Sequence, residues 1–360
     1  MFAPGPLALA DGMTRFVGDP VVAVFAETEA AARDAAELCE IDYDVLDAVT
    51  DAARALEDGA PLVWDEAPRN EAFTVTRGSR EAVEAAFATA HRIVSAQLRI
   101  SRVSANPLEP RAALAKWSPG EQKFTLYVGT HTPHAARHVL ANEVFGIHPA
   151  QLRVVSPDLG GSFGMREGGF PEYVLALWGA RRLGRPVRWR SDRSEAMSAD
   201  WHGRDNIAKA ELALDADGTF LGLSVRTLAN VGAYYSSAGS LVPIAHVGGL
   251  AGVYRTPAVF TEVTGVFTNT SPVGAYRGAG RPEATYVIER MIDIAKRGIG
   301  AMVTKTIAPL AAEVGRPCIA GKGNMIFNSE AWSEYPADIW IREYLPNLRK
   351  ASDIPVIASV

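Results

Sequence analysis

Two glycine-rich stretches, far apart in this chain of 360 residues, constrain its fold more than any other feature. Residues 160–167 have the sequence GGSFGMRE, and residues 274–283 have the sequence GAYRGAGRPE. Each stretch places glycines beside an aromatic side chain, an arginine and a carboxylate. Glycine allows main-chain N–H groups to approach a ligand closely, and arginine adds a fixed cation with planar donors. The two stretches therefore predict a fold that brings main-chain donors and a cation to a large polar cofactor.

Length and composition predict an ordinary globular protein with two or three domains. Apolar residues make up 48% of the chain and charged residues 21%, and the net charge of −5 gives no indication of a nucleic-acid or anionic-membrane partner. The start lacks the basic-then-apolar pattern of a signal peptide, and no apolar run approaches the roughly 20 residues that span a bilayer. The two cysteines, Cys39 and Cys318, are too few for an iron–sulfur cluster or a disulfide framework. We therefore expect a cytoplasmic protein with no membrane partner.

Hydrophobic periodicity, capping residues and turn residues predict an α+β fold without internal repeats. The sequence Asp215-Ala216-Asp217-Gly218 between two alternating runs indicates a hairpin. Residues 21–43 form a predicted strand–helix–strand unit that is too small to be a domain by itself, so we expect it to be the end of a larger one. Strands are predicted at 21–25, 40–43, 92–100, 124–128, 152–155, 187–190, 207–214 and 219–229, and helices at 27–38, 79–90, 132–145, 170–182 and 282–295.

The first glycine stretch lies between the predicted strand at 152–155 and the helix that begins near Phe170. Such a strand–loop–helix junction presents unpaired N–H groups to an anion, and the helix dipole adds to the attraction. A phosphate loop is the obvious alternative, but the Gly-Lys-Ser/Thr ending is absent and the spacing does not fit the dinucleotide fingerprint. By itself, the stretch is equally compatible with a plain tight turn.

The sequences of both stretches resemble those of the molybdenum-binding subunit of the xanthine dehydrogenase, aldehyde oxidase and carbon monoxide dehydrogenase family. Residues 160–164 are similar to the family's Gly-Gly-x-Phe-Gly loop, and residues 275–283 to its Ala-Tyr-Arg-Gly-x-Gly-Arg-Pro-Glu signature. The resemblance covers about residues 15–295, including a hammerhead-like segment at 15–24 and a segment at 107–111 that packs near the cofactor. It implies that Arg277 is the active-site arginine and that molybdopterin is bound by Gly160, Gly161, Ser162, Phe163, Gly164 and Gly278.

Glu167 occupies the position at which xanthine-type members of the family carry a glutamate that faces the substrate. The preceding Met165-Arg166 departs from their sequence. Two interpretations therefore stay open for Glu167: a catalytic, substrate-facing group, or a solvated carboxylate in a loop.

The resemblance implies oxidative hydroxylation of a small molecule, an aldehyde or an N-heterocycle, at a molybdenum–pterin centre. Electrons would leave through separate iron–sulfur and FAD subunits, in a homodimer of heterotrimers. Copper-containing carbon monoxide dehydrogenases carry a cysteine where this chain has Gly278, so the sequence disfavours carbon monoxide oxidation. The family's general-base glutamate lies far downstream of the arginine motif, in a region that this sequence replaces.

His131, His134 and His138 have a spacing that could suit zinc, with the last two one helical turn apart. No carboxylate or cysteine at ligand spacing completes such a site. We therefore expect no protein-ligated metal here.

Beyond residue 298 the sequence resembles a different enzyme class, the dihydropyrimidine and dihydroorotate dehydrogenases, which are (β/α)₈ flavoproteins. This resemblance implies FMN contacts from Lys305, Thr306 and Asn328, and pyrimidine contacts from Asn328 and Glu330. The stretch supplies only about two or three of the eight strands of a barrel, so FMN is expected only if this fragment is functional.

The predicted organisation is a hammerhead-like part with a linker at 1–70, the first part of a molybdopterin-binding domain at 71–297, and a barrel fragment at 298–360. Three hypotheses follow: an incomplete molybdenum hydroxylase, a fragment of an FMN-dependent pyrimidine dehydrogenase, or a non-catalytic chimeric chain. Because both glycine stretches must reach one cofactor, we expect Phe163 and Arg277 on one concave face with Gly161, within about 20 Å of each other.

Overall fold

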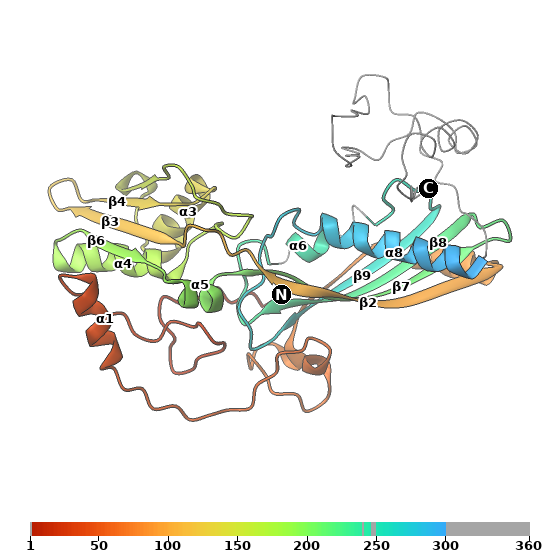
Figure 1. The fold of residues 1–360 in the computed structure, drawn as a ribbon, viewed down its shortest axis with the longest axis horizontal. Helices are drawn as coiled ribbons and strands as arrows, with labels where there is room; N and C mark the ends of the chain where they lie inside the picture. Colours follow the sequence, from red (N-terminus) through yellow and green to blue (C-terminus); the bar gives the residue numbers. More distant parts are fainter. Residues whose placement is uncertain (1, 240, 246–249, 300–360) are drawn as a thin grey trace, which may run out of the picture.

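A computed structural model describes residues 2–239, 241–245 and 250–299 of the chain. They form two lobes, each built on one β-sheet, which lie side by side along the long axis of the molecule (Figure 1). The barrel fragment predicted for 298–360, with Lys305, Thr306, Asn328 and Glu330, lies outside the described residues apart from its first two positions. Those two continue a helix that runs past its predicted end at residue 295 to Ile299.

The larger sheet has five strands in the order β1-β9-β8-β7-β2. All neighbours are antiparallel except β8 and β9, which are parallel. The long helix α8 lies across one face, and the shorter α2 packs against β8 and β9. The elements of this lobe are β1 (Glu71–Gly78), α2 (Arg80–Ala88), β2 (Arg92–Ser104), β7 (His202–Leu214), β8 (Phe220–Gly232), α6 (Leu241–Ile244), β9 (Ala258–Phe267) and α8 (Arg281–Ile299).

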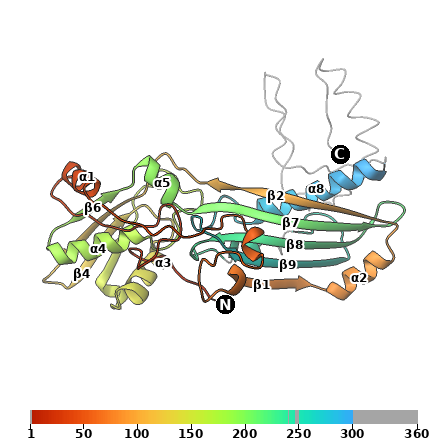
Figure 2. The same cartoon turned by 90° about the horizontal axis from the view of Figure 1, so that it is seen from below.

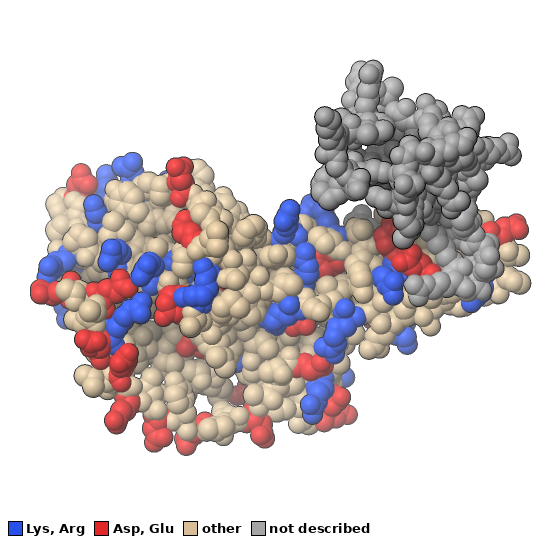
Figure 3. All heavy atoms as spheres, in the orientation of Figure 1, with Lys and Arg blue, Asp and Glu red and all other residues tan. Residues whose placement is uncertain are grey.

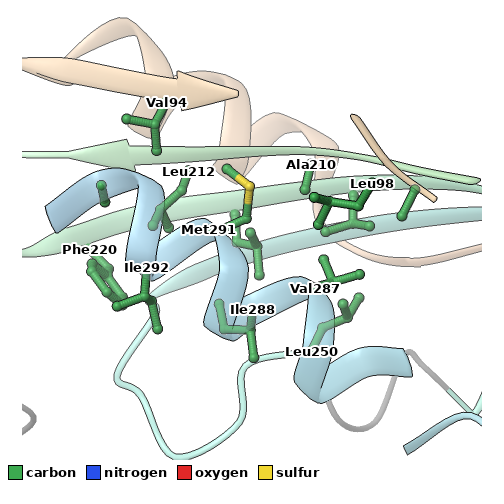
Figure 4. Packing of buried hydrophobic residues seen from close by; sticks show 14 of the residues in the cluster. Val94, Leu98, Ala210, Leu212, Phe220, Leu250, Val287, Ile288, Met291 and Ile292 are labelled. Carbon is green, nitrogen blue, oxygen red and sulfur yellow. The ribbon is translucent and has the colours of Figure 1, made fainter. Parts of the chain in front are cut away.

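Burial of one stripe of α8 holds this helix on the sheet. Val287, Ile288, Met291 and Ile292 are all at most 1% exposed and lie on one helical face, as their spacing of three and four residues requires. Figure 4 shows them directed at side chains of β2, β7 and β8, including Leu212. This contact fixes the start of α8, and with it the second glycine stretch, relative to the sheet.

The smaller sheet has four strands in the order β5-β4-β3-β6, with β4 and β5 parallel. Helix α4 packs on β3 and β6, and its buried residues join the core beneath the sheet. The elements are β3 (Ala112–Ser118), β4 (Lys123–Val128), α3 (Pro133–His138), a π-helical turn (Val139–Val144), a 3₁₀ turn (Pro149–Gln151), β5 (Leu152–Val155), α4 (Pro171–Leu183), β6 (Val187–Arg190) and α5 (Arg193–Ala199).

The N-terminal segment crosses both lobes as an extended chain (Figure 2). It contains α1 (Glu29–Glu37), capped by Thr28, and 3₁₀ turns at Arg54–Leu56 and Pro68–Asn70. The predicted strands at 21–25 and 40–43 were wrong: both segments are coil. None of the described strands pairs with them, and a strand forms only where its backbone groups find partners.

The remaining element predictions hold to within a few residues, with α2 capped by Ser79 as expected. The strands β1, β3 and β9 were missed, although each pairs within a sheet.

No described helix has the length and apolar character needed to cross a membrane. Basic and acidic side chains are interspersed over the face drawn in Figure 3.

A polar network lies where β2 and β7 pass from the larger sheet towards the smaller lobe. Arg102 pairs with Asp205 at 2.9 Å and donates to the carbonyl of Ser271 at 2.8 Å, just before the second glycine stretch. His202 contacts Arg102 at 3.3 Å. Burial, together with the Arg102 guanidinium, lowers the pKa of His202 from its ordinary value of 6.5.

The network predicts a pH dependence of stability. Because the folded pKa of His202 lies below the unfolded value, the unfolded chain binds more protons, and the free energy of unfolding should fall as the pH drops below about 6.5 towards the folded pKa. Urea denaturation of His202→Asn is expected to show a shallower decline over this range than the original chain. An equal slope in both proteins would contradict this assignment.

Candidate cofactor site

The two glycine stretches meet at the junction of the lobes. The N–H of Arg277 donates to the carbonyl oxygen of Phe163 at 2.8 Å, so the expectation that these two residues lie together is confirmed. Gly164 lies so close to the second stretch that a Cβ atom there would be 2.6 Å from the carbonyl oxygen of Ala275. The residues that the sequence marked out, more than a hundred positions apart, therefore form one continuous surface.

Several hydrogen-bond donors at this contact have no partner in the part of the chain that the structure describes. Among the described residues, no acceptor faces the N–H groups of Gly161, Ser162, Phe163 and Gly164, or the guanidinium of Arg277. Phe163 is 47% exposed and has a left-handed backbone with φ of 52°, which is rare outside glycine. Consecutive unpaired donors, a free cation and an exposed ring suit a polar, partly aromatic cofactor, so molybdopterin fits the groups present.

The first loop is held in shape by a buried arginine that the sequence did not single out. Arg166 is fully buried and pairs with Glu109 at 2.8 Å, and it also donates to the Glu109 carbonyl. The same carboxylate accepts from the N–H of Gly160 at 2.6 Å. Burial raises the pKa of Glu109, but Arg166 and the Gly160 N–H outweigh it and lower that pKa. The segment 107–111 thus packs on the glycine loop, as the resemblance implied.

A second buried arginine, Arg111, ties the same segment to helix α4. It makes a bidentate pair with Glu172 at 2.7 and 2.9 Å and a further bond to Asp200 at 2.6 Å. Its guanidinium also lies 3.9 Å from the ring centre of Phe170. No sequence pattern links these positions, because the partners come from distant segments.

The second loop is supported from beneath by Arg204 and Glu283. Arg204 lies over the ring of Tyr276 at 4.7 Å and donates to the carbonyl of Arg277 at 3.3 Å. Arg204 also forms an ion pair with Glu283 at 3.7 Å, and the side chain of Glu283 is almost completely buried. Glu283 belongs to the first turn of α8, where a negative charge complements the helix dipole.

Gly278 leaves no room for a side chain. Its φ is 93°, and a Cβ atom there would be 2.5 Å from the Cδ atom of Pro282. A cysteine at this position would therefore require the start of α8 to move.

Glu167 and Ser162 are joined through His131. The imidazole Nε2 lies 3.0 Å from Glu167 Oε1, and Nδ1 lies 2.8 Å from Ser162 Oγ.

Of the histidines whose spacing could suit zinc, His138 contacts Asn142 on the next helical turn. Within the described ranges, no three His, Cys, Asp or Glu side chains are placed to hold a metal ion.

The close contact at Gly164 yields a prediction about stability. Gly164→Ala is expected to lower the free energy of unfolding by about 1–3 kcal/mol, because the residue has φ of 105° and its new methyl group would meet Ala275. Gly120→Ala is the control, since a Cβ there meets nothing within 4 Å. Equal denaturation midpoints for the two variants would contradict the predicted contact between the loops.

A two-lobed α+β fold whose glycine loops meet, with unpaired main-chain donors beside an arginine, defines a domain that binds a polar cofactor. Residues 63–304 match the family described as the molybdopterin cofactor-binding domain. This match spans more than half of the chain, and the chain belongs to this family.

Individual relatives agree with this assignment. The gamma subunit of the 6-hydroxypseudooxynicotine dehydrogenase complex of Paenarthrobacter nicotinovorans is 38% identical over 81% of this chain and 36% of its own length. The carbon monoxide dehydrogenase large chain of Hydrogenophaga pseudoflava is 37% identical over 79% of this chain and 37% of its own. The crystal structure of quinoline 2-oxidoreductase from Pseudomonas putida 86 has 36% identity and a TM-score of 0.75, covering 81% of this chain and 37% of that one.

The chain spans little more than a third of the length of these curated relatives. The matches support the molybdenum part of the resemblance and give no support to a dihydropyrimidine dehydrogenase-like fragment at 298–360.

Proposed function

We propose that this chain supplies the cofactor-binding part of a molybdenum hydroxylase, which oxidatively hydroxylates an aldehyde or an N-heterocycle. The observation that carries the proposal is the hydrogen bond from Arg277 N–H to the Phe163 carbonyl, which joins the two loops of a molybdopterin-binding family. When bound, the cofactor supplies the oxygen transfer and accepts the two electrons of the oxidation.

The protein's own groups have separate roles in this proposal. The N–H groups of residues 161–164, together with Gly278, hold the cofactor, and the exposed ring of Phe163 packs against it. The N–H of Gly160, which the resemblance also assigned to the cofactor, donates to Glu109 instead. The guanidinium of Arg277 binds an oxygen on the substrate that gains negative charge, because its planar donors are preorganised and have no competing partner among the described residues. Glu167 accepts a hydrogen bond from the substrate and orients it.

Carbon monoxide oxidation is the less favoured activity, although the relatives include carbon monoxide dehydrogenase large chains. Gly278 supplies no thiolate for copper, and the space beside it is closed by Pro282. We further propose that separate iron–sulfur and FAD subunits carry the electrons away, since relatives are named as a subunit of a complex and as a large chain.

The test is to purify the chain together with its partner subunits and to measure molybdenum, copper and pterin content alongside turnover. The expected result is bound molybdopterin without copper, and reduction of an electron-accepting dye that depends on an aldehyde or an N-heterocycle. Protein that carries molybdopterin but oxidises only carbon monoxide would overturn the proposed substrate class. Protein without pterin would overturn the cofactor site.

A further inference from the structure

His131 makes a bridge between two parts of the first glycine loop, and the proposed roles of that loop do not use it. The residue follows β4 and precedes α3, whereas Ser162 and Glu167 both belong to the loop. Its two ring nitrogens contact Ser162 Oγ at 2.8 Å and Glu167 Oε1 at 3.0 Å. The imidazole is about one-third exposed, and the ring of Phe163, next in sequence to Ser162, is 47% exposed.

With a neutral imidazole and an ionised carboxylate, the chemistry of the partners sets the direction of each hydrogen bond in this bridge. An ionised carboxylate only accepts, so the neutral ring must carry its proton on Nε2 and donate it to Glu167. Nδ1 is then an acceptor and receives the hydroxyl proton of Ser162. The Ser162 oxygen in turn accepts from the main-chain N–H of Arg166 at 3.2 Å. In this chain of bonds, every donor therefore faces an acceptor.

We infer that His131 is a positioning residue for Glu167, an inference that rests on the proposed substrate-binding role of that carboxylate. The bridge uses Oε1 and leaves Oε2 without a hydrogen-bond partner among the described residues. The ring therefore sets the orientation in which Oε2 is presented to a hydrogen-bond donor on the substrate, such as a ring N–H or a hydroxyl. Through Ser162 and Arg166, the same bridge connects the carboxylate to the backbone of the loop that holds the cofactor.

Two amide substitutions separate the two halves of the bridge. In His131→Gln the amide reaches the position of Nε2 and keeps the contact with Glu167, whereas in His131→Asn it occupies the position of Nδ1 and keeps only the contact with Ser162. His138 is the matched control, since it also contacts an amide and lies near a glutamate, but on an exposed helix away from the loop.

In the assembled enzyme, His131→Asn is expected to raise KM about 10- to 100-fold with little change in kcat, because a hydrogen bond to a charged group that orients the substrate is lost. His131→Gln should stay within about 3-fold of the original enzyme, and His138→Asn should not differ from it. Equal losses in the Asn and Gln variants, or no loss in either, would overturn the inference.

A second measurement on the cofactor-free, full-length chain keeps this inference separate from the proposed function. With ¹⁵N-labelled histidine, the Nε2–H proton of His131 should give an exchange-protected resonance at low temperature, present in Ser162→Ala and absent in Glu167→Ala. A resonance that is missing from the original chain, or that persists in Glu167→Ala, would overturn the bridge. If the cofactor-free chain gives the expected resonance but the assembled, pterin-loaded enzyme shows no turnover, the proposed function is contradicted and the bridge stays in place.

Discussion

Replacement of Arg277 by alanine is expected to lower kcat/KM of the assembled enzyme by about 100- to 1,000-fold, the usual loss when one preorganised donor to a developing negative charge is removed. The bond that joins the two loops uses the main-chain N–H of this residue, so it survives the substitution. Its guanidinium has no partner among the described residues, so the loss should fall on catalysis and not on folding.

Steady-state kinetics with an aldehyde and an N-heterocycle would measure this effect, with pterin content determined on the same preparations. Arg277→Lys should recover only part of the activity, because an ammonium keeps the charge but not the planar pair of donors. Arg290→Ala is the control, since Arg290 lies on the surface of α8 and pairs only weakly with Asp293 at 3.6 Å. Retention of full activity by Arg277→Ala would refute the role proposed for this arginine.

Replacement of Arg111 by methionine is expected to lower the free energy of unfolding by about 3–5 kcal/mol. Arg111 has no exposed side-chain surface, and its partners Glu172 and Asp200 are 12% and 4% exposed. Without the guanidinium, both carboxylates would be left in a low-dielectric interior with no opposite charge. Urea denaturation followed by circular dichroism would measure the loss.

Two comparisons make this result specific to the buried pairs. Arg33→Ala removes an exposed pair with Glu29 within one helix and should cost less than about 0.5 kcal/mol. Adding Glu172→Gln and Asp200→Asn to Arg111→Met should restore part of the stability, because the uncompensated charges are then gone. A triple variant that is less stable than the single one would show that packing of the arginine, and not charge, supports this region.

The parts of the fold that depend on local rules could be predicted from the sequence. Ser79 caps α2 through its own side chain, and the apolar spacing in α8 matches its buried face. The hairpin at 215–218 likewise follows from turn residues between alternating strands. In each case the decisive residues lie within one or two turns of each other.

The strands β1 and β9 escaped prediction because their pairing depends on partners far along the chain: β1 pairs with β9, almost 200 positions away. Distance does not explain the missed strand β3, which forms a local hairpin with β4 as well as a pair with β6. The opposite error at 21–25 also depends on pairing: this apolar run has a suitable composition, but no strand in the described part of the chain pairs with it.

The candidate site also has a part that could be predicted from the sequence and a part that only the tertiary structure decided. The sequence by itself identified both glycine stretches, because glycine, aromatic and arginine residues in a fixed order have a local backbone requirement that can be recognised. Only the tertiary structure decided that Phe163 and Arg277 touch, that Arg166 and Glu109 shape the first loop, and that His131 joins Ser162 to Glu167. The partners in each of these contacts are far apart in the sequence. Only long-range packing brings them within hydrogen-bond distance.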